Sequence, residues 1–139
     1  MKITEILSQE KPVLSFEVFP PKKESAYETV EQAAVEIARL SPSFMSVTYG
    51  AGGGTSQYTA DLAACLAKKY GVTSMAHLTC VSSTREHVMG VVERLRENGI
   101  ENILALRGDV NPDIPPKTDF AHASDLVSYI RAHSDFGVM

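Results

Sequence analysis

The chain has 139 residues and a formal net charge of −4, with 44% apolar and 22% charged residues. This length and balance are typical of one globular domain with its own core, and they exclude a disordered chain. No basic block stands out, which argues against nucleic acid as the main partner. No apolar stretch is long enough to span a membrane, and residues 1–7 lack the apolar segment of a signal peptide.

Cysteine usage favours a reducing compartment. The two cysteines are Cys65 and Cys80, and their spacing matches neither a disulfide framework nor a paired zinc motif. No second His or carboxylate stands at metal-ligand spacing from His77, so zinc is not expected and we predict no metal site. The expected location is the cytoplasm.

A short apolar run that ends in polar residues recurs about every thirty residues, each time followed by a helical pattern. The runs are residues 13–17, 44–48, 73–77 and 103–109, and a fifth opens at 136–139. Strands that alternate with helices predict βα units and a parallel sheet, in which ligands bind at the carboxyl ends of the strands.

Helical patterns separate these runs. Ser25 with Glu28, and Ser83 with Glu86, are typical capping boxes for the first and third helices. The second helix is expected at about residues 56–69 and the fourth at about 122–133, and the segment 108–121 is a long loop. The side chains expected to face the core include Leu40 in the first helix, Leu62, Cys65 and Leu66 in the second, Val88, Val92 and Leu95 in the third, and Leu126 and Ile130 in the fourth.

Alternation along the strands separates an apolar face from a smaller face that becomes polar. We expect Glu17, Ser46, Thr48 and His77 on the polar side of the first three strands. In the fourth strand, Ile103, Ala105, Arg107 and Asp109 are expected to share a face, opposite Leu104 and Leu106. A one-sided pattern fits the inner face of a barrel better than a flat sheet covered on both faces.

The predicted fold is therefore α/β, made of parallel (β/α) units of a TIM barrel. A complete (β/α)8 barrel takes about 250 residues, so residues 1–139 supply about four of eight units as a single domain, a half-barrel. Such a half leaves two edge strands and an open inner face, which are an aggregation liability.

Glu17 lies between aromatic residues, where a carboxylate needs a partner or a raised pKa. A raised pKa suits a general acid. The alternative, given about equal weight, is a structural ion pair between Glu17 and Arg107. His77 alone is more typical of a satisfied core residue than of a ligand.

Two further segments have the composition of an anion site. Residues 50–55 are glycine-rich and open a helix, but they match neither the dinucleotide fingerprint nor a Walker motif, and a flexible loop is the simpler interpretation. Arg107 and Asp109 flank Gly108 at a strand end, where Arg suits a phosphate and Gly allows close backbone approach. The alternative for this pair is a mutual ion pair.

Four ordered segments together resemble the methylenetetrahydrofolate reductase family of flavin enzymes. They are residues 15–21, 44–51, 77–80 and 99–109, and the resemblance runs from about residue 12 to residue 139. It implies a (β/α)8 barrel with FAD at the carboxyl ends of the strands. It also implies reduction of 5,10-methylenetetrahydrofolate to 5-methyltetrahydrofolate with NAD(P)H, in one-carbon metabolism and methionine biosynthesis.

The resemblance also implies roles for single residues. Glu17 matches the general acid that opens the imidazolidine ring, and Asp109 matches a carboxylate near both the flavin and the pterin. The other positions that match flavin contacts are Thr48, Tyr49, Ala51, His77, Arg107 and Gly108, with Arg107 expected at an FAD phosphate.

The second half of the family's barrel supplies a Tyr-Pro-x-x-His segment, a flavin-binding Lys and folate-binding Gln residues, which this chain lacks. We therefore expect weak activity, or none, from the isolated chain, which is either a homo-oligomer or a part that lacks its carboxyl-terminal half. The non-catalytic alternative is a truncated half-barrel that only pairs with itself or with a second polypeptide. Another anion-binding barrel enzyme is a weaker alternative.

Overall fold

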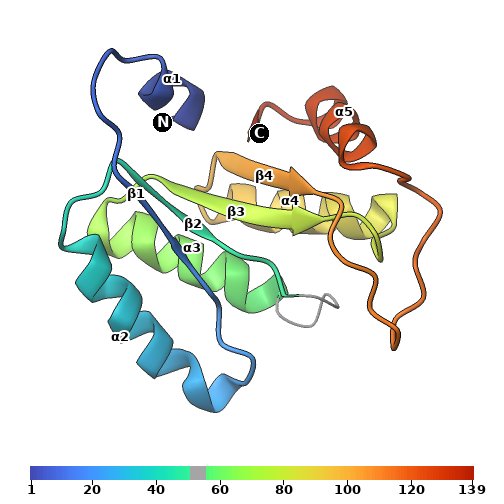
Figure 1. Ribbon diagram of the computed structural model, residues 1–139, viewed down its shortest axis with the longest axis horizontal. Coiled ribbons are helices and arrows are strands. Elements are labelled where there is room, and N and C mark those ends of the chain that lie inside the picture. The colour runs from blue at the N-terminus through green and yellow to red at the C-terminus, as the bar shows by residue number, and fades with distance from the viewer. Residues whose placement is uncertain (51–55) are drawn as a thin grey trace.

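The computed structural model describes residues 1–50 and 56–139 and has alternating strands and helices (Figure 1). The strands β1 to β5 form one parallel sheet in chain order. Their bounds are Ser15–Val18, Phe44–Val47, Ser74–Thr79, Asn102–Leu106 and Gly137–Val138. The helices are α1 (Ile3–Leu7), α2 (Tyr27–Ala38), α3 (Ser56–Tyr70), α4 (Arg85–Glu97) and α5 (Ala123–His133), and a 3₁₀ turn, η1 (Glu24–Ala26), precedes α2. This order confirms the predicted α/β class and the (β/α) units of a partial barrel.

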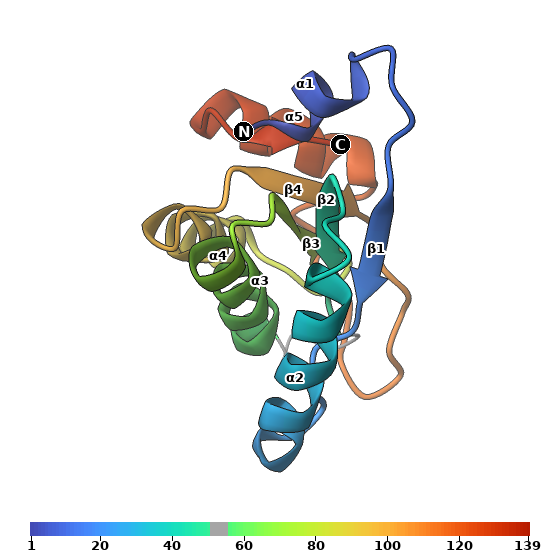
Figure 2. The same cartoon turned by 90° about the vertical axis from the view of Figure 1, so that its left-hand side faces the viewer.

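The main core lies between the sheet and helices α2 to α5. Met45 and Val47 of β2, and Ile103 of β4, are fully buried against helix residues such as Leu62 and Leu126. Figure 2 shows α2, α3 and α4 along one side of the sheet, with α5 next to β4. The predicted apolar face is therefore the helix-covered face, and the opposite face of the sheet carries the polar residues.

Helix α1 covers the amino-terminal end of that opposite face, which the sequence analysis did not predict. Ile3 and Ile6 form a second apolar cluster with Met75 of β3. The Asn102 side chain, 1% exposed, accepts the backbone N–H of Ile3 at 2.8 Å and donates to the backbone carbonyl of Met1 at 3.0 Å. The first residues of the chain are thus fastened to β4 across the start of the sheet.

Two predicted helix starts are wrong by one or two residues. Ser25 lies in η1, and α2 follows from the N-cap Ala26 without a side-chain cap. The N-cap of α4 is Thr84, whose hydroxyl accepts the backbone N–H of His87, whereas the Ser83 hydroxyl donates to the carbonyl of Thr79. The capping boxes predicted at Ser25 and Ser83 are therefore wrong.

The predicted faces hold for β1, β2 and β3, but in β4 they are reversed, so the expected faces of Ile103, Ala105 and Leu104 are wrong. Ile103 and Ala105 face the helices, and Leu104 packs on the α1 side. The strand ends at Leu106, so alternation no longer places Arg107 or Asp109. Leu40, expected in the core, is exposed because α2 has ended before it.

No helix in the described part of the chain is long and apolar enough to cross a membrane.

Candidate active site

Three side chains from neighbouring strands meet on the open face of the sheet. Glu17 of β1 stands opposite Ser46 of β2 in the strand register, and Ser46 stands opposite Met75 of β3. The Ser46 hydroxyl donates to Oε2 of Glu17 at 3.2 Å. Nε2 of His77, two residues further along β3, lies 3.3 Å from the same oxygen. The parallel register therefore brings a carboxylate, a hydroxyl and an imidazole together.

The His77 ring is buried, whereas the carboxylate it approaches is half exposed. The side chains of His77 and Glu17 are 7% and 49% exposed. Burial lowers the pKa of His77 below its ordinary value, and the negative charge of Glu17 partly opposes that shift. Nε2 is close to Oε2 but lacks the alignment of a hydrogen bond, and it has no other hydrogen-bond partner in residues 1–50 and 56–139. A buried polar atom without a hydrogen bond is unusual outside functional sites.

These contacts bear on the structural interpretation of Glu17. The side chain that approaches its Oε2 is His77, and no ion pair joins Glu17 to Arg107 in the described residues, so the expected Glu17–Arg107 bridge is wrong. Glu17 nevertheless has the partner that a carboxylate between apolar residues needs. A half-exposed carboxyl group such as Glu17, which Ser46 and His77 contact from the sheet, can exchange a proton with a bound molecule.

Thr48 and Tyr49 follow the end of β2. The backbone N–H of Thr48 donates to the carbonyl of Val18, and its carbonyl accepts the hydroxyl of Thr59 at 2.9 Å. The Tyr49 hydroxyl lies 3.1 Å from Nε2 of His87 on α4, so its side chain reaches toward the helix layer. Thr48 therefore stays near Glu17's strand, whereas the ring of Tyr49 extends away from the Glu17 side of the sheet.

Arg107, Gly108 and Asp109 follow β4. The Arg107 carbonyl accepts the backbone N–H of Val81 at 2.8 Å. Gly108 has φ +81°, and a Cβ there would lie 2.9 Å from Cβ of Thr79, so its close approach is to Thr79. Asp109 is exposed, and no ion pair joins it to Arg107 in the described residues, so the expected mutual pair is wrong.

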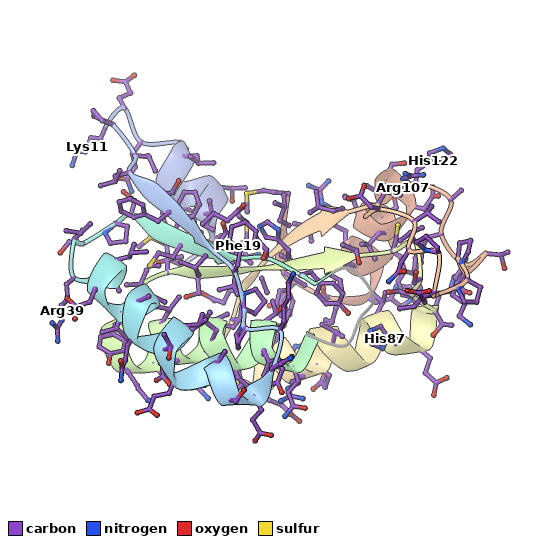
Figure 3. The ribbon with its side chains drawn as sticks, turned by 60° about the horizontal axis from the view of Figure 1, so that its bottom comes forward. Lys11, Phe19, Arg39, His87, Arg107 and His122 are labelled. Carbon is purple, nitrogen blue, oxygen red and sulfur yellow. The ribbon has the colours of Figure 1, made fainter. Side chains whose placement is uncertain are left out.

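The Arg107 side chain is exposed at the end of the molecule where α5 begins. Figure 3 shows Arg107 and His122, the N-cap of α5, at that end, and His87 on the α4 side. The positive charge of Arg107 acts on the Cys80 thiol, as does the negative charge of Asp125 in the first turn of α5. Burial is the larger influence and raises the pKa of Cys80.

Ala51 and most of the glycine-rich segment 50–55 lie outside the described residues. In the parts of the chain that are described, no group of three or more His, Cys, Asp or Glu side chains could hold a metal ion.

The sequence pattern placed Ser46 on the correct face of β2 but indicated no role for it. Its position directly across from Glu17 in a parallel pair was the signal that could have revealed one.

Comparison with known proteins adds to this geometry. The family model "Methylenetetrahydrofolate reductase" matches residues 2–139, which is nearly the whole chain. The chain belongs to the methylenetetrahydrofolate reductase family. This finding confirms the family resemblance drawn from the four sequence segments, and it agrees with the partial barrel.

Relatives in this family come from plants, bacteria and fungi. "Methylenetetrahydrofolate reductase (NADH) 1" of Arabidopsis thaliana is 36% identical over 135 residues, covering 94% of this chain and 23% of the relative. "5,10-methylenetetrahydrofolate reductase" of Pectobacterium carotovorum subsp. carotovorum is 36% identical over 125 residues, covering 90% and 41%. "Methylenetetrahydrofolate reductase 1" of Schizosaccharomyces pombe is 37% identical over 132 residues, covering 90% and 21%. The chain therefore spans less than half the length of these relatives.

Proposed function

We propose that the chain forms the first half of the catalytic barrel of a flavin-dependent methylenetetrahydrofolate reductase. The reaction is the reduction of 5,10-methylenetetrahydrofolate to 5-methyltetrahydrofolate, with NAD(P)H as the electron donor. The product carries the methyl group that methionine biosynthesis uses. The observation that supports it is the convergence of Ser46 and His77 on Glu17, the position that matches the family's general acid. The family match over residues 2–139 supports the same assignment.

The described residues fit part of an FAD site. The Nε2 atom of His77 is buried and has no hydrogen bond in the described residues, which is unusual for a polar atom outside functional sites. Phe19 and Leu106 are large apolar side chains exposed near the carboxyl ends of β1 and β4, and such surface suits a flat aromatic group (Figure 3 labels Phe19). Arg107 offers an exposed cation for a phosphate.

The residues proposed to hold FAD are Thr48, Tyr49, Ala51, His77, Arg107, Gly108 and Asp109. When bound, the flavin would accept a hydride from NAD(P)H and pass it to the folate. Glu17 is proposed to protonate N10 of the substrate as the bond from the bridging carbon to N10 breaks. The lone pair of N5 then forms the C=N bond of an iminium ion, which accepts the hydride.

Asp109 is proposed to bind the pterin and to stabilise the positive charge that develops on the substrate. A fixed carboxylate near a forming cation lowers the barrier most when water is excluded. Asp109 is exposed in this chain, so water exclusion there would depend on the rest of the barrel.

The unpaired strand edges support a partner for this half-barrel. In the described residues β1 pairs only with β2, and β5 pairs only with β4. We propose that these edges meet either the carboxyl-terminal half of the barrel or another copy of the chain. A non-catalytic half-barrel that only self-associates is the second candidate, and the exposed Phe19 and Leu106 favour it if no flavin binds.

Two details of the proposal concern location and electron donor. Cys65 and Cys80 are free thiols, which supports a reducing compartment, the cytoplasm. NADH is named for the Arabidopsis relative, and it is the first donor to test.

The test is to purify the chain alone and together with the remaining barrel of a relative, and to add FAD. The proposed enzyme is yellow and oxidises NADH or NADPH in the presence of methylenetetrahydrofolate. Glu17→Gln should keep the flavin and lose about 100-fold or more of folate reduction. A preparation that stays colourless in both forms contradicts the enzymatic proposal and leaves the self-associating half-barrel, which gel filtration would detect as a dimer.

A further inference from the structure

We propose that Ser46 and His77 are positioning residues for Glu17, which hold one carboxylate oxygen so that the other faces the substrate. This inference rests on the proposed function, because it assigns partners to the proposed general acid. It adds a role for Ser46, and a role for His77 other than flavin contact.

The contacts converge on a single atom. Both the Ser46 hydroxyl, at 3.2 Å, and Nε2 of His77, at 3.3 Å, lie next to Oε2 of Glu17. In the described part of the chain, Oε1 has no hydrogen bond or ion pair. The two carboxylate oxygens of Glu17 therefore have different surroundings.

Burial reinforces this difference. Ser46 and His77 are both 6% exposed and stand on β2 and β3, whereas half of the Glu17 side chain is exposed on the edge strand β1. Side chains fixed by a central strand lose little further freedom when they hold a partner. Oε2 is consequently fixed from the sheet side, and Oε1 is the oxygen that a bound molecule can reach.

The arrangement suits an acid that gives up its proton. A hydroxyl donates best to an oxygen that carries no proton, so the Ser46 contact favours the proton of neutral Glu17 on Oε1. When that proton moves to N10 of the substrate, Glu17 becomes a carboxylate. The hydrogen bond from Ser46 then becomes charge-assisted and stronger. Nε2 of His77, 3.3 Å from the same oxygen, is close enough to donate a second hydrogen bond to that carboxylate if it carries the ring proton and comes into line with it.

The first test separates the two half-reactions of the flavin-loaded enzyme. Ser46→Ala should slow flavin reoxidation by methylenetetrahydrofolate about tenfold through lower kcat, and it should leave flavin reduction by NAD(P)H unchanged. Ser46→Cys keeps the volume with a weak donor and should behave like Ser46→Ala, whereas Ser46→Thr should restore the rate. The matched control is Ser74→Ala, which removes a buried hydroxyl that bonds to the carbonyl of Val72 and not to Glu17.

The second test needs no flavin. In the purified chain, NMR titration of the His77 ring should give a higher pKa in Ser46→Ala, because the carboxylate then relies more on His77. Glu17→Gln should lower the pKa of His77, because the negative charge of Glu17 favours the protonated ring and opposes the effect of burial. His133→Gln helps to assign the signals, since His133 lies on α5 and contacts Tyr129.

Equal slowing of both half-reactions, or a Ser46→Ala rate equal to that of Ser74→Ala, overturns the inference. An unchanged His77 titration in both Ser46→Ala and Glu17→Gln also overturns it. Failure of the proposed function looks different: the parent enzyme binds no flavin, while the His77 titration still responds to the two substitutions.

Discussion

Nε2 of His77 lies 3.3 Å from Oε2 of Glu17, although the two residues belong to β3 and β1 and β2 runs between them. The imidazole is buried and the carboxylate is half exposed. This pairing links the stability of the sheet to the protonation of a group on its open face, and the first prediction follows from it.

The stability of the chain should decrease as the pH falls below the ordinary pKa of histidine, about 6.5. Burial lowers the pKa of His77 in the folded state, so the unfolded state binds more protons between that lowered pKa and 6.5. The free energy of unfolding therefore rises with pH in this window and contributes no slope above it. Urea unfolding at several pH values measures the effect.

His77→Gln removes the titrating group and should flatten this part of the profile. His133→Gln, on the exposed end of α5, is the matched control and should keep the slope of the parent chain. A His77→Gln profile as steep as that of the parent would show that another group is responsible.

Cys65 should react slowly with alkylating reagents in the folded chain. Burial raises the pKa of Cys65 to about 11, together with the negatively charged Glu31. The Cys65 thiol donates a hydrogen bond to Oε1 of Glu31, with 2.9 Å between Sγ and Oε1. Glu31→Gln removes that charge and should speed alkylation at mildly alkaline pH, because more thiolate is present. Mass spectrometry of the modified peptides follows Cys65 and Cys80 separately. Cys80 makes no contact with Glu31, so an equal rise at both cysteines would indicate general loosening instead.

Asn102→Ala should destabilise the fold by about 1–3 kcal/mol, because it leaves buried backbone groups of the first residues without partners. The Asn102 side chain bonds to the N–H of Ile3 and to the carbonyl of Met1. Chemical denaturation measures the loss. Asn111 lies in a loop, where its side chain accepts the nearby N–H of Asp113, so Asn111→Ala should cost about 0.5 kcal/mol or less. Similar losses in the two variants would argue against an anchoring role for Asn102.

Gly108→Ala should cost more stability than Gly71→Ala. Both glycines have positive φ, +81° and +66°, so each substitution adds backbone strain of about 1–2 kcal/mol. Only at Gly108 would the new Cβ collide, 2.9 Å from Cβ of Thr79, whereas nothing lies within 4 Å at Gly71. Overpacking adds about 1–3 kcal/mol. Thermal unfolding of the two variants gives the comparison, and equal melting temperatures would refute the close contact.

Much of the fold follows from local patterns in the sequence. Period-two alternation placed Met45 and Val47 against the helices and Ser46 on the other face, because one face of each strand must be buried. The buried residues Val88, Val92 and Leu95 on α4 follow from helical spacing. Helix starts were less accurate, since Ser83 and Thr84 are both capable caps and only the backbone conformation chooses between them.

The candidate site depended on contacts between strands, which spacing does not specify. Glu17 needed a partner, but His77 and Arg107 were both chemically suitable. The choice was decided by where β4 ends, because Arg107 lies beyond the strand and next to the start of α5. The sequence analysis did not predict helix α1, because five residues are too few to show a helical repeat of apolar positions. Its burial also depends on Asn102 of β4, which is distant in the sequence.

The attachment of Ile3 to Asn102 also bears on synthesis. The partner of this first helix is made nearly a hundred residues later, at a separation of 99 positions. During synthesis, Ile3 and Ile6 therefore stay exposed to water, or bound to a chaperone, until β4 emerges from the ribosome. Ile3 therefore reaches its native hydrogen bond only after β4 has been made.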